Sequence, residues 1–163
     1  MKQNPIRAVL LFLVVTLALC ASACLDFKSV VRATPAASDA AKQEFAEIER
    51  TGEISPEART QLDAVADEAA GTASNLSASF GNWGKLSPAE RRQAVLNFIN
   101  NLSSSADRLE AAGALHLKNP QSKSKFESYQ RNLRRAVSMG RIYLASLPDK
   151  EPVPGVEPGA ATK

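Results

Sequence analysis

Prolines that directly follow a helix-capping residue recur at a constant spacing along this chain of 163 residues. Ser55-Pro56, Ser87-Pro88 and Asn119-Pro120 are separated by 32 residues each, and Pro152 lies 32 residues farther on. A capping residue followed by proline is typical of a helix N-terminus, because the first helical residue does not need its backbone N–H. Each interval therefore predicts one helix of about 25 residues, ~38 Å long, followed by a short connection.

The apolar residues agree with this division. Within each interval they recur at steps of three and four, as on the buried face of a helix, and no stretch shows the sustained period-two alternation of a strand. Thr34-Pro35 predicts a further, shorter helix from Pro35 to Thr51 that stops at Gly52, a natural C-cap. Matched lengths and short links imply antiparallel neighbours. We therefore predict an all-α fold, a small antiparallel helical bundle of three long helices and one short N-terminal helix.

The predicted bundle domain covers residues 35–147. Residues 24–34 are expected to form a tether, in which Phe27, Val30 and Val31 supply apolar side chains able to dock onto the bundle. Residues 148–163 contain four Pro and two Gly without apolar periodicity, so we expect a disordered tail. Phe80 and Trp83 close one apolar stripe, and two interpretations stay open for them: a cap on the core or a hot spot for a partner.

An export signal precedes the domain. Lys2 and Arg7 come before an apolar run, Ala8 to Leu19, which is broken only by Thr16 and is too short to cross a bilayer core of ~30 Å. Such a run is typical of a secretory signal peptide, here residues 1–23. The small residues Ala21-Ser22-Ala23 then lead directly to Cys24.

This arrangement resembles the lipobox of bacterial lipoproteins, in which the cysteine after the small residues is acylated and becomes the new N-terminus. The resemblance implies lipidation at Cys24, and Ala21 stands where the family prefers Leu. Cys20 follows the bulky Leu19 and fits less well. The alternative is an ordinary signal that is cleaved after Ala23 and leaves a single cysteine.

Removal of residues 1–23 changes the charge balance. The whole chain has a formal net charge of +3, whereas residues 24–163 contain 18 basic and 17 acidic side chains and a net charge of +1. An exported protein of this charge provides no case for binding nucleic acid, which we do not expect as a partner.

The charges are nevertheless sorted along the chain. Asp39 to Glu68 contains nine acidic residues against three basic ones, and Lys118 to Arg141 contains seven basic residues against one acidic one. Two interpretations follow: the two segments neutralise each other inside the bundle, or the basic helix faces an anionic lipid or an acidic envelope partner. The candidate binding residues lie mainly off the apolar stripe of that helix and are Arg131, Arg134, Arg135 and Arg141.

A nine-residue pattern starting at Ile54-Ser55-Pro56 is echoed 32 residues later, starting at Leu86-Ser87-Pro88. It resembles the paired LTxxQ motifs of the periplasmic stress chaperones, all-helical proteins that hold unfolding clients. Ala58 and Glu90 stand where that family has its Gln. The same pattern is also a generic helix start, with a hydrophobic staple and a capping box.

Residues for catalysis are few. His116 is the chain's single histidine, and Asp63 and Asp67 share a helical face without the Glu-x-x-His partners of a di-iron bundle. Ser103-Ser104-Ser105 lacks a nucleophile-elbow context. We therefore expect no enzymatic activity, no cofactor and no metal site.

Together these features predict an exported lipoprotein, anchored to a cell membrane or outer membrane through the lipid on Cys24 and facing the periplasm or the cell exterior. Its expected role is non-enzymatic binding, scaffolding or envelope structure. The alternative is an LTxxQ-like periplasmic stress chaperone or signalling adaptor.

The anchor is tested by the substitution Cys24→Ser in the full chain. We expect the variant to leave the membrane fraction or to accumulate as uncleaved precursor, because serine lacks the thiol at which the lipid would be attached. Membrane fractionation and gel migration measure this. A variant that fractionates and migrates like the parent protein would show that Cys24 is not acylated.

Overall fold

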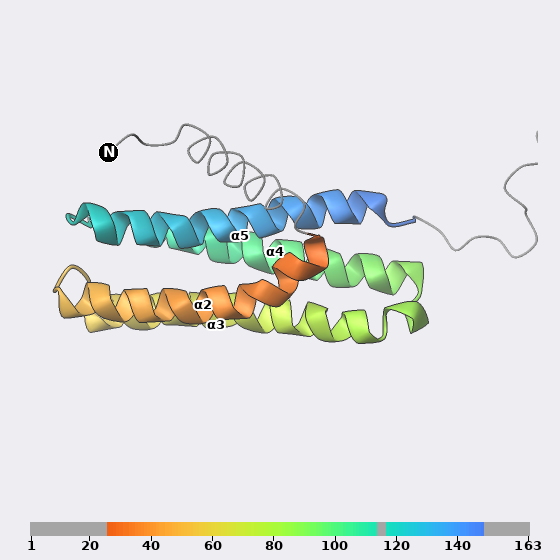
Figure 1. Cartoon of the computed structure of the whole chain (residues 1–163), viewed down its shortest axis with the longest axis horizontal. Helices are drawn as coiled ribbons and strands as arrows, with labels where there is room; N and C mark the ends of the chain where they lie inside the picture. The colour runs from red at the N-terminus through yellow and green to blue at the C-terminus, as the bar shows by residue number, and fades with distance from the viewer. Residues whose placement is uncertain (1–25, 114–116, 149–163) are drawn as a thin grey trace, which may run out of the picture.

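The fold is a four-helix bundle (Figure 1). The computed structural model describes residues 26–113 and 117–148. The long helices are α2 (Phe27–Arg50), α3 (Pro56–Gly81), α4 (Pro88–Gly113) and α5 (Pro120–Ser146), and a short 3-10 turn, η2 (Trp83–Lys85), links α3 to α4. Helix α2 packs on α3 and α5, and α4 packs on the same two helices. The described residues contain no strand, so the predicted all-α helical bundle is confirmed.

Three helices begin where the prolines predicted. Pro56, Pro88 and Pro120 are the first residues of α3, α4 and α5. The Ser55 hydroxyl accepts a hydrogen bond from the Ala58 N–H at 3.2 Å, and the Asn119 side chain accepts one from the Gln121 N–H at 2.9 Å. Local capping chemistry thus sets these boundaries.

The prediction for the first helix is wrong. Helix α2 begins at Phe27, capped by Asp26, and continues through Pro35, so that the bundle has four helices of similar length rather than three long and one short. Residues 27–34, which we expected in the tether, are helical because burial of Phe27 and Val31 outweighs the cost of an internal proline.

The first turns of α2 bend toward α5, as Figure 1 shows in orange. Pro35 lacks the N–H that would bond to the Val31 carbonyl, and the Thr34 hydroxyl donates to the Val30 carbonyl at 2.9 Å. Both features bend helices. Gly52, at φ +75°, makes the expected turn after α2.

The core contains two aromatic groups joined by aliphatic side chains. Near the α2–α3 turn, Phe45 lies 6.1 Å from both Phe126 and Tyr129, measured between ring centroids. The Tyr129 hydroxyl shares a buried hydrogen bond of 2.9 Å with the Ser38 hydroxyl, and burial raises the Tyr129 pKa. The second group lies at the other end and includes Phe80 and Trp83, which pack against the core as one of our two interpretations expected.

Gly140 permits the close packing of α5 beside the second aromatic group. A Cβ atom at this position would lie 2.9 Å from Ile99 Cγ1 and 3.4 Å from Phe27 Cε2. A larger residue would therefore force α5 away from α2 and α4.

Two glycine substitutions test this close approach. We expect Gly140→Leu to lower the free energy of unfolding by about 1–3 kcal/mol through overpacking. The matched substitution Gly71→Ala, in a mid-helix site where an added Cβ meets nothing within 4 Å, should raise it by about 0.5–1 kcal/mol. Urea unfolding measures both, and a neutral Gly140→Leu variant would contradict the packing described.

Candidate functional site

Cations from α2, α3 and α4 pair with much of the acidic segment, Asp39 to Glu68, and α5 contributes a further cation near the α2–α3 turn. Lys125 of α5 pairs with Glu44 of α2. Beside that pair, Glu53 accepts hydrogen bonds from the Asn119 N–H at 3.2 Å and from the Ser122 hydroxyl at 3.1 Å. The predicted compensation between the two charged segments therefore exists near the α2–α3 turn.

Other acidic residues pair with bases from α2, α3 and α4. Lys42 lies 2.7 Å from Asp67, and this hydrogen bond raises the Lys42 pKa. Arg59 lies 2.8 Å from Asp63 and 3.2 Å from Glu49. Arg108 of α4 pairs with Glu68 of α3 in the same way. Asp63 and Asp67, which share a helical face as predicted, are thus both partners of a cation.

The four candidate arginines on α5 are all exposed. Arg131 lies 3.6 Å from Glu127 on its own helix, and Arg134 pairs with Glu110 of α4. Neither acid belongs to the Asp39 to Glu68 segment. Arg141 forms no ion pair with the residues that the structure describes.

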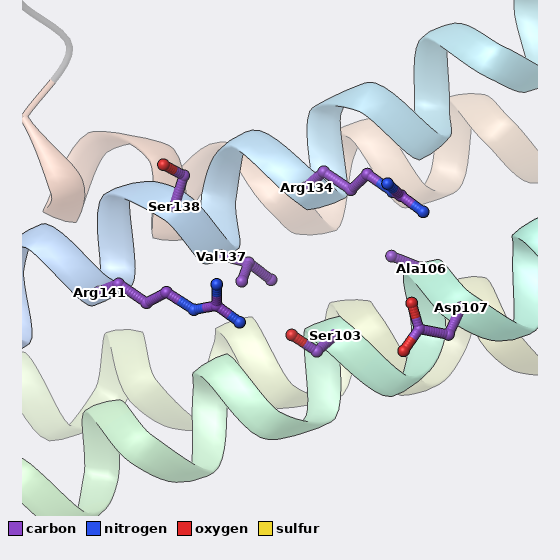
Figure 2. A pocket seen from close by; sticks show the side chains of 7 residues that line it. All are labelled: Ser103, Ala106, Asp107, Arg134, Val137, Ser138 and Arg141. Atoms are coloured by element: carbon purple, nitrogen blue, oxygen red, sulfur yellow. The ribbon is translucent and has the colours of Figure 1, made fainter.

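A shallow groove of about 280 Å³ lies on the surface between α4 and α5, which pack against each other (Figure 2). Arg134 and Arg141 stand toward its two ends, with Val137 between them. Helix α4 contributes Ser103 and Asp107. The two guanidinium groups suit an anionic group, and the Asp107 carboxylate can accept a hydrogen bond from a donor on the same ligand.

Sequence reasoning identified the arginines but missed this groove. Their i, i+7 spacing and the i, i+4 spacing of Ser103 and Asp107 are visible in the sequence, whereas the pairing of the two faces depends on how α4 packs against α5. Reasoning from the apolar stripe also missed Ile142, which lies off it and is 70% exposed. Cys24 and His116 lie outside the described residues.

The structure gives the repeated sequence pattern a capping role at both helix starts. At α4, the Ser87 N–H and hydroxyl donate to the Glu90 carboxylate at 2.7 and 2.8 Å, and the Glu90 N–H donates to the Ser87 hydroxyl at 3.3 Å. This reciprocal arrangement is a capping box. The chaperone resemblance itself stays a prediction.

No family model matches the chain, and comparison with curated proteins and with solved structures finds nothing similar to it. Among the described residues, no group of three or more His, Cys, Asp or Glu side chains is placed to hold a metal ion. None of the described helices combines the length and the apolar character needed to cross a membrane.

The capping box predicts a pH dependence. The backbone and hydroxyl hydrogen bonds of Ser87 lower the Glu90 pKa below its ordinary value of 4.5. Because the folded-state pKa is the lower one, the stabilisation is complete at neutral pH and is lost as the pH falls through the lowered pKa. We expect Glu90→Gln to lose less stability than the parent protein between pH 7 and pH 3. Melting temperatures across this range measure the difference, and identical losses would contradict the role of Glu90.

Proposed function

We propose that this protein is a lipid-anchored, extracytoplasmic binding or scaffold protein of the cell envelope, without enzymatic activity. Cys24 carries the lipid, and the exposed arginines of α5 bind an anionic group on a lipid or an acidic envelope partner. The groove between α4 and α5 is the centre of this surface.

One observation carries the binding proposal: the ion pairs described for the acidic segment are to cations other than Arg131, Arg134 and Arg141. Lys42, Arg50, Arg59, Arg108 and Lys125 form ion pairs with it. Arg131 and Arg134 use exposed acids outside that segment, with side chains 64% and 54% exposed themselves. Exposed ion pairs of this kind contribute little stability. An anionic ligand can therefore replace the acidic side chain of each pair at a small cost in free energy.

The anchor proposal depends on the sequence pattern and on the position of the first described helix. Asp26, the N-cap of α2, lies two residues after Cys24. An acyl chain on Cys24 would therefore hold the folded body directly beside the membrane, where each basic side chain gains ~1 kcal/mol from anionic lipid.

A triple charge reversal tests the binding surface independently of the lipid. In the mature chain with Cys24→Ser, we expect Arg131→Glu, Arg134→Glu and Arg135→Glu together to weaken binding to anionic vesicles and envelope fragments at least about tenfold. The melting temperature should change little, and binding of the parent should weaken as salt rises.

The matched control reverses the charges of Arg50, Lys118 and Lys123. These residues are exposed near the α2–α3 turn and the start of α5, away from the groove. It makes the same change in net charge and should retain binding. Equal loss in both variants would show that net charge alone acts. A loss of stability without a loss of binding would show that the α5 arginines serve the bundle itself.

A further inference from the structure

An apolar hollow of about 220 Å³ lies where the start of α2 meets the end of α5. Its lining residues are Asp26, Phe27, Met139, Ile142, Tyr143 and Ser146. Ile142 is the exposed large hydrophobic residue of the described chain, at 70% exposure. A large apolar side chain beside an open apolar hollow suggests a surface that another apolar phase covers.

The hollow has a rigid base. Phe27 stacks on Tyr143 with ring centroids 4.7 Å apart, and Trp83 lies 6.2 Å from the same tyrosine ring. Gly140 lets Ile99 of α4 pack closely against α5 beside these rings. The neighbours of Ile142 are therefore held in place by packing, while Ile142 itself remains outside.

The position of the hollow along the chain limits what can cover it. Asp26 lines the hollow and lies two residues after Cys24, a reach of at most ~7 Å for an extended chain. If Cys24 carries the lipid, the hollow lies within one or two side-chain lengths of the bilayer surface.

The charge of the described residues is also divided along the bundle axis. The end that holds the hollow comprises residues 26–35, 77–98 and 135–148, with two acidic side chains, Asp26 and Glu90. Its seven basic residues are Lys28, Arg32, Lys85, Arg91, Arg92, Arg135 and Arg141. The other described residues carry 12 acidic and nine basic side chains. The end nearest Cys24 therefore has a net charge of +5 and the remainder −3, which favours an anionic surface at that end.

We propose that the end of the bundle formed by the start of α2 and the end of α5 docks on the anionic lipid surface that holds Cys24, with Ile142 entering the interface. This deepens the proposed function, on whose lipid anchor it rests. It names the membrane as the partner of this end and gives the bundle a fixed orientation, with the acidic end directed away from the lipid.

The chain contains a reporter for this contact. Trp83 is its single tryptophan and lies in the aromatic group beneath the hollow. We would reconstitute the full lipidated protein into vesicles containing anionic lipid and compare brominated with ordinary acyl chains. We expect bromine to quench Trp83 emission, because the docked hollow brings the ring near the interface.

Ile142→Asp should weaken docking about tenfold or more and remove most of the quenching, since a charged group replaces the inserted side chain. Ile142→Leu should retain quenching. The matched control Ser128→Asp adds the same charge on an exposed position of α5 nearer the opposite end and should also retain it.

The outcomes separate the anchor from the docking. Protein that floats with the vesicles without quenching would leave the anchor intact and overturn the docking. Protein that does not float would overturn the anchor, and the docking with it. Quenching that appears only when the chain ends at Pro148 would show that residues 149–163 cover the hollow instead. The protein could instead form a dimer in detergent that Ile142→Asp dissociates. If Ile142→Asp also left the quenching in vesicles at the level of the parent protein, the hollow would be assigned to a second copy.

Discussion

Phe27 contacts an aromatic ring from each of the other three long helices. Its centroid lies 6.2 Å from that of Phe80 in α3, 5.5 Å from that of Phe98 in α4 and 4.7 Å from that of Tyr143 in α5. The ring fits because Gly140 leaves room beside Ile99. This contact brings the start of α2 onto α5, and it therefore determines where the chain enters the bundle and where the apolar hollow lies.

The charged side chains are distributed unevenly over the surface of the bundle, independently of how the core packs. Ion pairs between neighbouring helices neutralise much of the acidic half, whereas Arg131 and Arg134 of α5 pair with acids outside it, Glu127 and Glu110. Arg92 serves the bundle directly, since it donates to the Leu144 and Leu147 carbonyls at 3.3 and 3.0 Å and satisfies the end of α5. The basic residues near the end of α5 thus have different roles, and only some are available to a partner.

The proposed roles of the anchor, the α5 arginines and the hollow are physically compatible. A lipid on Cys24 holds the protein at the membrane, and a second contact made of basic and apolar groups strengthens this binding. A body held in one orientation presents the groove between α4 and α5 at a constant height above the lipid. Binding and scaffolding benefit from that geometry because it limits the orientations a partner must search.

Local chemistry was enough to predict much of this fold. The capping residue and proline at Ser55-Pro56, Ser87-Pro88 and Asn119-Pro120 act within one helical turn, so three helix starts and the apolar stripes could be predicted from the chain alone.

The start of α2 could not be predicted in this way. Burial of Phe27 and Val31 against distant residues overrode the local signal at Pro35. The same holds for the candidate site: the exposed arginines follow from helical periodicity, whereas the groove and the exposed hollow at Ile142 depend on which helices become neighbours. Helix pairing is decided by long-range packing and by ion pairs between segments far apart in sequence, and no local pattern encodes it.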